Sequence, residues 1–382
     1  MHPLLTAGFR PFFLAAATWA AVSLAAWLSL LAGGIDLPSR FDPLSWHIHE
    51  MLFGFIMAAV GGFLLTAIPS WTNRAPVAGT PLAVLVTLWL LGRVACLFSA
   101  MIPGWLAPIA DLAFPVALEV VAARELFAVG NKRNYPLLAP IIVLAIANLL
   151  MHLQALGFAI PAGLGWRLGI AGVIVLISVI GGRIIPTFTR NWLAEHGISR
   201  VPAPVGRLDR VALGTLHAAM IGWTFFPDRV AVGALLLIAA ALNLVRLAGW
   251  RGVATLSEPL LLILHVGYLW LVAGVALLGL SLITDAVPTA AAVHALTAGA
   301  MGTMILSVMT RATLGHTGRA LHADATTITI YALVSASAAL RVVAAWWIDA
   351  QVDLLEVSGL TWVGAFALFV AKYGPMLLAS RR

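Results

Sequence analysis

Long apolar stretches follow one another along almost the whole sequence, separated by short polar segments or by glycine and proline. A hydrocarbon core about 30 Å thick requires roughly 20 apolar residues of helix to cross it. Because 62% of the residues are hydrophobic and only 10% are charged, a water-soluble globule would lack the polar surface that it needs. The sequence therefore predicts an all-α polytopic membrane protein.

We predict twelve transmembrane helices in a single transmembrane domain, residues 1–382. Glycine, proline and clusters of charge mark the breaks between helices. The first apolar run is too long for a signal-peptide core and is predicted to be a retained helix, whereas the seventh and eighth spans are short and separated only by FPDR. The predicted spans are 11–33, 43–68, 80–100, 104–127, 137–157, 166–186, 211–226, 229–248, 259–282, 289–310, 326–348 and 354–376.

The distribution of lysine and arginine predicts that both termini are cytoplasmic. Cytoplasmic loops collect these residues, and all but five of the 22 fall at the termini, in the loops after even-numbered spans or at the adjoining helix ends. The net charge of +7 is then a topological signal, and no nucleic-acid partner is predicted. The five exceptions are Arg40, Arg93, Arg167, Arg229 and Arg341.

Residues 44–55 read LSWHIHEMLFGF and place three ionisable groups, His47, His49 and Glu50, at the start of the second span. A bilayer tolerates such groups where something binds or neutralises them, so this stretch is a candidate site. Cys96 is the only cysteine, which argues against a disulfide framework or a cysteine-based zinc or iron–sulfur site. We therefore expect any metal ligands to be histidines, carboxylates or methionines.

Three predicted spans bring imidazoles to the outer level of the membrane. His47 and His49 start the inward-running second span, His152 lies at a similar depth on the fifth, and His294 falls roughly 8 Å below the outer end of the tenth. Neutral imidazole binds both haem iron and copper. HALTAGAMG after His294 supplies small residues beside which a macrocycle fits, so we predict a haem between the second and tenth spans.

The opposite haem ligand is expected to be His49, with His47 as the alternative. The two residues are two apart on one helix, so their side chains point about 200° away from each other. Glu50 is equally well explained as a salt-bridge or hydrogen-bond partner at the interface, and a single intramembrane histidine is often only a helix contact. Copper must then rely on other imidazoles, for which the candidates are His265, His217 and His152.

Among these we favour His265 over His217 as a ligand of copper or of a second haem, with His152 assigned to the outer site. Tyr268 follows His265 by one turn and is a candidate to hydrogen-bond a bound gas or supply a proton, although a plain helix contact explains it equally well. On the inner side, guanidinium groups suit haem propionates or another anion, and ordinary positive-inside arginine is the competing explanation. The residues concerned are Arg10, Arg183, Arg190 and Arg311, with His316 beside them.

Three inward-running spans, spaced by four helices, end in similar short motifs. These are GGFLLTAIPSWT (61–72), GGRIIPTFTR (181–190) and LSVMTR (306–311). They are consistent with a four-helix unit repeated three times, although short Gly, Pro and Thr-Arg matches also arise by chance in a chain with 34 glycines.

Several longer motifs resemble the NnrS family of bacterial inner-membrane proteins. They are GFRPFF (8–13), WHIHEMLFGF (46–55), GGFLLTAIPSWT (61–72), GGRIIPTFTRN (181–191), LHVGYLW (264–270) and HALTAGAMGTMILSVMTRATLGHTGR (294–319). The resemblance implies a multi-pass protein of the bacterial inner membrane that carries copper and haem, which we expect to be b-type. It further implies a link to nitric oxide metabolism and nitrosative-stress resistance. The motif histidines are His47, His49, His265, His294 and His316, with His152 in a weaker match.

A more distant similarity connects the predicted twelve helices to the catalytic subunit of haem–copper oxidases. In that group the second and tenth helices bring haem ligands, but this chain has no histidine on the sixth span and only His217 on the seventh. A copy of the oxidase copper centre is therefore not expected. The expected partners are membrane lipid, nitric oxide or a related small molecule, and an electron donor for a metallo-oxidoreductase.

The alternative function is a secondary transporter with intramembrane histidines. Twelve spans are typical of such proteins, and Pro69, Pro115 and Pro186 are then expected to mark broken helices.

Overall fold

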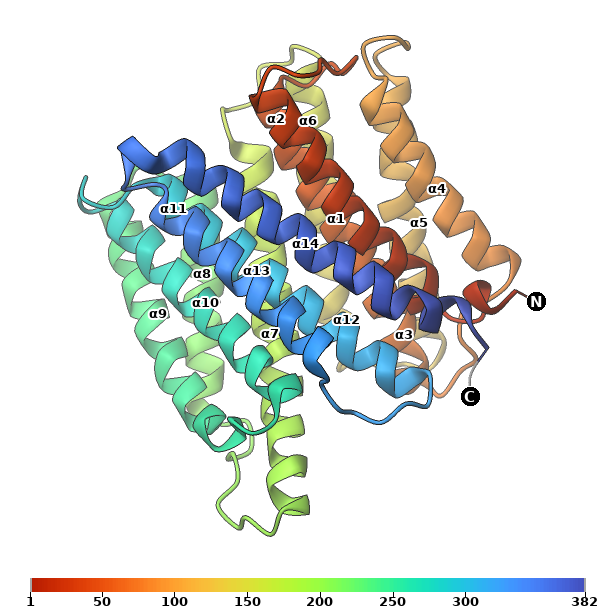
Figure 1. The fold of residues 1–382 in the computed structure, drawn as a ribbon, viewed down its shortest axis with the longest axis vertical. Coiled ribbons are helices and arrows are strands. Elements are labelled where there is room, and N and C mark those ends of the chain that lie inside the picture. Colours follow the sequence, from red (N-terminus) through yellow and green to blue (C-terminus); the bar gives the residue numbers. More distant parts are fainter. Residues whose placement is uncertain (1, 381–382) are drawn as a thin grey trace. The chain divides into compact units, whose positions relative to one another are not determined.

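The computed structural model describes residues 2–380, and within these residues the chain is helical without any strand. Twelve long helices occupy the twelve predicted spans, which confirms the all-α prediction (Figure 1). Ten of them are α1 (Phe9–Leu31), α4 (Thr80–Leu97), α5 (Leu106–Ala128), α6 (Leu138–Ala155), α7 (Leu164–Glu195), α8 (Arg207–Phe225), α9 (Val230–Gly249), α10 (Pro259–Ser281), α13 (Ala325–Val343) and α14 (Gln351–Leu378).

The second and tenth spans are composite. Each begins with a short α-helix, widens into a π-helical segment and continues as an α-helix. In a π-helix the backbone hydrogen bonds run from residue i to i+5, an arrangement that is rare and frequently found at functional sites. The second span consists of α2 (Pro43–His49), η2 (Glu50–Ile56) and α3 (Met57–Thr72), and the tenth of α11 (Thr289–His294), η5 (Ala295–Gly302) and α12 (Thr303–His316).

In both composite spans a histidine, His49 or His294, is the last residue before the π-helical segment. A proline stands six residues before each histidine. The two spans for which the sequence predicts haem-ligating histidines are therefore also the two spans that contain a π-helical segment.

Within the described residues, eleven of the twelve spans are long and apolar enough to cross a membrane. The exception is α8, which carries Arg207, Asp209 and Arg210 in its first turn. Proline does not break the helices as expected for a transporter. Pro69, Pro115 and Pro186 all lie inside continuous helices, and α7 runs nine residues beyond Pro186 to Glu195.

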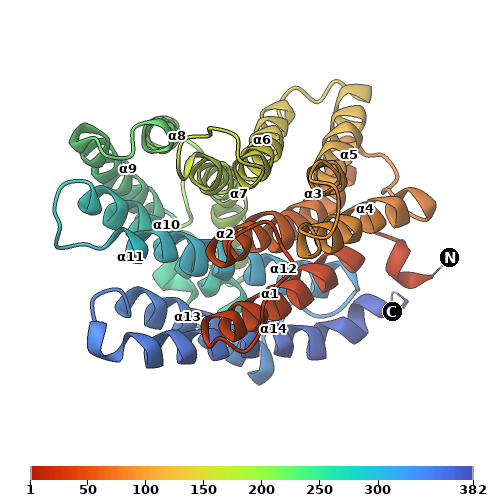
Figure 2. The same ribbon diagram turned by 90° about the horizontal axis from the view of Figure 1, so that it is seen from above.

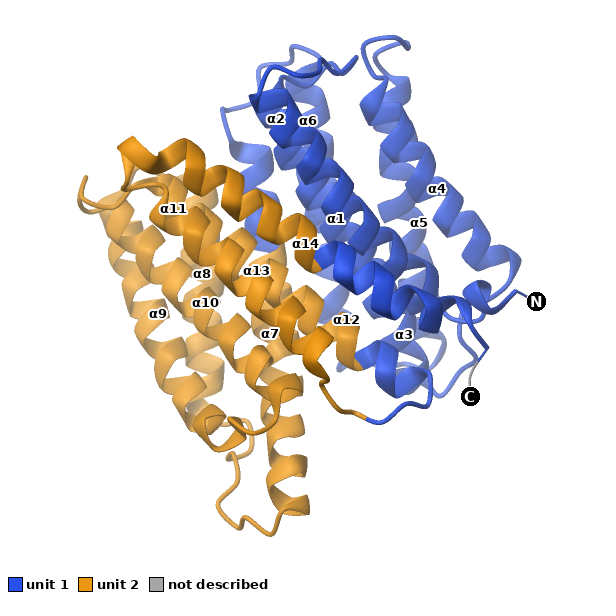
Figure 3. Ribbon diagram, viewed as in Figure 1, with its two compact units in different colours: residues 1–172, 312–320, 366–382 blue, residues 173–311, 321–365 orange. Residues whose placement is uncertain are grey.

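The chain divides into two compact units (Figure 3). Unit 1 comprises residues 1–172, 312–320 and 366–382, and unit 2 comprises residues 173–311 and 321–365. Three of the boundaries fall inside α7, α12 and α14, and the fourth falls between α12 and α13. The three-fold repeat and the orientation of the termini stay predictions.

In unit 1, α5 packs between α4 and α6, and α1 packs along α3 and η2 (Figures 1 and 2). The interior of this unit contains large apolar side chains such as Phe12, Phe13 and Phe114, but also several fully buried charged groups. In unit 2, α9 packs between α8 and α10, while α10 and α13 cover η5. In each unit, regular helices therefore pack around a π-helical segment.

Candidate metal centre

A buried arginine between two carboxylates forms the base of the site in unit 1. Nη1 of Arg93 on α4 donates to Oε2 of Glu50 at 2.7 Å, and its Nη2 donates to Oδ1 of Asp111 on α5. None of the three side chains is more than 3% exposed. Burying charged groups costs free energy unless they are paired, so this triad of ion-paired side chains is a candidate functional site.

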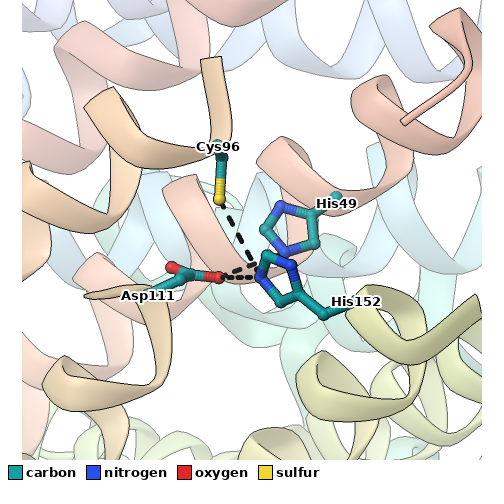
Figure 4. A group of neighbouring side chains, drawn as sticks. All are labelled: His49, Cys96, Asp111 and His152. Atoms are coloured by element: carbon teal, nitrogen blue, oxygen red, sulfur yellow. Dashed lines mark hydrogen bonds and ion pairs between the residues drawn. The ribbon is translucent and has the colours of Figure 1, made fainter. Parts of the chain in front are cut away.

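Two imidazoles and a thiol converge on the same carboxylate (Figure 4). Nε2 of His152 on α6 lies 3.0 Å from Oδ2 of Asp111, and Nε2 of His49 lies 3.2 Å from the same oxygen. Sγ of Cys96 lies 3.9 Å from Nε2 of His152. These four ligand atoms all lie within 4.8 Å of one another and all belong to buried residues.

Further polar groups fix the orientation of His49. Its Nδ1 lies 3.1 Å from Oε1 of Glu50, and its Nε2 lies 2.9 Å from Oδ1 of Asn148. Asn148 also donates from Nδ2 to Oδ2 of Asp111 at 2.8 Å. The ring of Phe41 stacks on His49 with centroids 4.6 Å apart. The imidazole is therefore held on its edges by hydrogen bonds and on one face by an aromatic ring.

Gly54 in the π-helical segment makes room for a contact between Trp19 and Glu50. Gly54 follows Glu50 by four residues, and the space beside it is filled by the indole of Trp19 from α1. Nε1 of Trp19 donates to Oε2 of Glu50 at 2.8 Å, while Nε1 of Trp89 donates to the carbonyl of Gly54 at 3.0 Å. A side chain at position 54 would displace Trp19, so glycine here permits the contact that completes the environment of Glu50.

The donor set fits a single metal ion. A tetrahedral ion with ligands at about 2.0–2.3 Å separates neighbouring donor atoms by roughly 3.3–3.8 Å, similar to the spacing in this group. Imidazole, thiolate and carboxylate are ligands of zinc and copper. Two carboxylates face one arginine, so with neutral imidazoles the site has an excess of negative charge that a cation balances. The contact of Nδ1 of His49 with Glu50 is the outer support typical of metal-bound histidine.

The structure brings together two of the predicted histidines, His49 and His152, and places His47 elsewhere. The ring of His47 stacks on Trp27 of α1 with centroids 4.8 Å apart. The sequence predicted only histidines, carboxylates and methionines as ligands, and the group adds the thiol of Cys96 as a fourth potential donor.

His294 belongs to unit 2, and its Nδ1 lies 2.7 Å from the carbonyl oxygen of Ala290. This contact requires the proton on Nδ1, so the lone pair of this tautomer is on Nε2. Indole rings fill the space beside two of the small residues that follow it. Trp270 packs against Gly299, and Trp362 packs against Gly302. Within unit 2 these glycines therefore accommodate tryptophan rather than leaving room for a macrocycle.

The remaining predicted metal ligands lie apart from such a group. Nε2 of His265 is 3.0 Å from Oγ1 of Thr189, and Nε2 of His217 is 3.0 Å from Oγ of Ser178. The hydroxyl of Tyr268 donates to Oδ1 of Asn243 at 2.7 Å and accepts from Nη1 of Arg246 at 2.7 Å. Tyr268 is thus a fully buried member of a hydrogen-bond network.

The predicted inner-side arginines are divided between the units. Arg10 and His316 in unit 1 line the same cavity. In unit 2, Arg190 donates to the carbonyl oxygens of Pro202 and Ala203, and the guanidinium of Arg311 lies 4.4 Å from the ring centroid of Phe188. Arg183 is half-buried on α7.

Sequence reasoning missed Arg93, Cys96, Asp111 and Asn148 as site residues. Arg93 and Asp111 nevertheless carry a signal, because charged residues inside apolar spans are functional candidates by default. Arg93 was also one of the few basic residues outside the predicted inner side.

The fold and this donor set define a polytopic membrane protein with a buried site that is compatible with a metal ion. A family model described as NnrS protein matches residues 3–381, essentially the whole chain. The chain belongs to the NnrS family. No curated protein gives a significant match.

Proposed function

We propose that this chain is a copper- and haem-containing membrane protein of nitric oxide metabolism, with copper held by His49, Cys96, Asp111 and His152. The observation that supports this proposal is the convergence of two imidazoles, a thiol and a carboxylate in a region without exposed surface. Thiolate and imidazole are ligands that copper prefers. The metal and the link to nitric oxide follow from the family resemblance.

The surrounding residues have separate roles in this proposal. Glu50 orients His49 through Nδ1, and Arg93 holds Glu50 and Asp111 in place. Phe41 and Phe53 pack on His49 with ring centroids 4.6 and 5.2 Å away, which excludes water and suits a small apolar gas. Copper, when bound, supplies a redox-active atom with affinity for nitric oxide.

Haem stays with His294 in this proposal because of the family resemblance alone, since Trp270 and Trp362 fill the space beside the glycines that follow it. The hydrogen bond to Ala290 fixes the tautomer in which Nε2 carries the lone pair. A haem fits His49 less well than a single ion, because Asp111, Asn148 and His152 crowd the Nε2 side of the ring and Phe41 covers its face. We therefore assign His49 to copper instead of haem, and move copper away from His265.

Metal analysis and absorption spectra of the full chain in detergent test both assignments. Cys96→Ser and His152→Ala are expected to lose most copper while keeping haem, and His294→Ala to lose haem while keeping copper. His217→Ala is the matched control, since it removes a half-buried histidine of unit 2 outside the donor set.

Loss of copper from His265→Ala but not from His152→Ala would refute the copper site. Colourless, metal-free wild-type protein would instead favour a secondary transporter. A spectral change on adding nitric oxide to the wild type, absent in Cys96→Ser, is the expected sign that the copper site binds the gas.

A further inference from the structure

A second site in unit 1 lies at the ends of α1, α3, α12 and α14. It is a cavity of about 450 Å³ lined by Phe9, Arg10, Leu65, Thr66, Pro69, Ser70 and His316, together with Pro3, Thr6, Ala7, Pro76 and Ser380. None of these lining residues is acidic. The lining is thus cationic at one part and apolar or hydroxyl-bearing elsewhere.

Arg10 is a built part of this cavity. Its side chain is only 4% exposed, and Nη1 donates to the carbonyl oxygens of Leu377 and Ala379 at 2.8 and 2.5 Å. These contacts hold the guanidinium at the end of α14. All of its hydrogen bonds to described residues leave from Nη1, so the other nitrogens are not committed to those residues.

A second guanidinium lies nearby and forms no salt bridge with any residue of 2–380. Arg319 is close enough for its charge to act on Arg10, and its buried Nη1 has no hydrogen-bond partner among residues 2–380. Two like charges held together in a partly buried place repel each other unless an anion lies between them. The buried Nη1 of Arg319, which has no hydrogen-bond partner among residues 2–380, is the observation that indicates a bound anion.

The backbone adds to this preference for an anion. Helix α1 begins at Phe9, and its N-cap, Gly8, makes no side-chain hydrogen bond, while the amide of Arg10 donates to the carbonyl oxygen of Ala7. The N-terminal end of a helix carries partial positive charge and attracts anions. Ala7 just before this turn, and Phe9 and Arg10 within it, line the cavity.

We propose that this cavity binds the phosphate group of an acidic phospholipid. The guanidinium of Arg10 in the lining, with the charge of Arg319 acting beside it, matches a phosphate. The apolar lining of Phe9, Leu65 and Pro69 matches the hydrocarbon next to the phosphate. A free phosphate would leave most of the volume and all of the apolar lining unused. Because the helices are membrane spans, their ends lie where lipid headgroups are found. The proposal is independent of the metal centre.

The test uses the full chain in detergent, stripped of lipid and then offered phosphatidylglycerol, phosphatidylcholine or inorganic phosphate. Native mass spectrometry and the melting temperature report binding. Phosphatidylglycerol is expected to bind and raise the melting temperature, whereas the other two are not. Arg319→Gln is expected to weaken phosphatidylglycerol binding about fivefold, the effect of about 1 kcal/mol per arginine.

Two more variants keep the test decisive. Ser70→Leu fills the cavity without changing charge and is expected to weaken lipid binding as well. Arg74→Gln is the matched control, because this exposed arginine already pairs with Glu125. Arg10→Gln is avoided, since Arg10 also holds the end of α14.

Equal binding of phosphatidylglycerol and phosphatidylcholine would overturn the proposal, as would unchanged binding in Arg319→Gln and Ser70→Leu. Binding of inorganic phosphate alone would overturn the lipid assignment. Loss of the haem absorption in Arg319→Gln, with lipid binding unchanged, would assign the cavity to haem carboxylates instead.

Discussion

Arg93 in unit 1 and Arg246 in unit 2 are both buried in apolar helices, but their surroundings differ in charge. Arg93 faces two carboxylates, Glu50 and Asp111. Among the described residues Arg246 forms one salt bridge, with Asp209 at 2.8 Å, and its Nη1 donates to the hydroxyl of Tyr268. The network in unit 2 is therefore balanced by its own residues. In unit 1 both ring nitrogens of His49 face carboxylate or amide oxygens, so the network is balanced either by a protonated His49 or, when the imidazoles are neutral, by a bound cation. Among the described residues, this second network is the one that adjoins a group of possible metal ligands.

The largest expected effect comes from removing Arg93. Arg93→Met leaves two carboxylates buried without a cation, and breaking such a pair costs about 3–5 kcal/mol. Arg246→Met leaves only Asp209, whose side chain is 16% exposed, so we expect a smaller loss of about 1–3 kcal/mol. The melting temperatures of the two variants in detergent measure this difference. Equal losses would contradict the view that the two networks differ in charge balance.

The second largest effect is expected from removing the metal ion of unit 1 with a chelator. If a cation balances unit 1, a chelator lowers the unfolding free energy of the wild type by about 2.7 kcal/mol for an ion present at 100 times its Kd. Asp111→Asn removes one ligand and the excess charge, so its melting temperature is expected to change little on chelation. Arg246→Met should respond as the wild type does. A chelator effect of the same size in Asp111→Asn would show that the metal binds elsewhere.

The glycines of the two π-helical segments give a third comparison. In Gly54→Ala the added methyl group meets Trp19 and lies 2.9 Å from Oε2 of Glu50, and in Gly302→Ala it meets Trp362. We expect each change to cost roughly 1–2 kcal/mol through overpacking. Copper content, measured on the purified variants, should fall only for Gly54→Ala. A fall in both would indicate a general effect of π-helical strain.

The smallest expected effect on stability comes from the N-terminal cap of α2. Oδ1 of Asp42 caps α2 by accepting from the amide of Ser45 at 3.0 Å, whereas Pro288 at the start of α11 gives no side-chain cap. Asp42→Ala is expected to cost about 1 kcal/mol. Burial alone raises the pKa of Asp42, but hydrogen bonds from Ser45 and Leu44 outweigh it and hold the pKa below the ordinary value of 3.8.

The sign of the pH effect follows from this lowered pKa. The capping contribution is present above pH 3.8 and is lost as the pH falls through the lower pKa of the folded protein. Acidification should therefore reduce the difference in melting temperature between the wild type and Asp42→Ala. A difference that persists at the lowest pH would argue that the carboxylate charge plays no part in the cap.

The long helices were predictable because hydropathy is a local property, and Asp42-Pro43 correctly marked the start of the second span. The site was only half predictable. His49 and His152 stand out as imidazoles in apolar spans, but their meeting with Asp111 depends on how α2, α5 and α6 pack. The π-helical turns could not be predicted from proline, because η2 and η5 contain none. Pro69 and Pro186 lie in continuous helices instead.

The widened turn after His49 also bears on how such a site arises in evolution. A π-helical segment holds one residue more than the α-helix that would span the same rise, as an insertion into an older regular helix would leave it. Deleting one residue within η2 (Glu50–Ile56) would restore the tighter hydrogen bonding and turn α2 by about 100° relative to α3. His49 would then face away from Asp111 and His152, while the apolar face of α3 would keep its contacts. A single codon thus separates a regular membrane helix from one that brings His49 to Asp111 and His152.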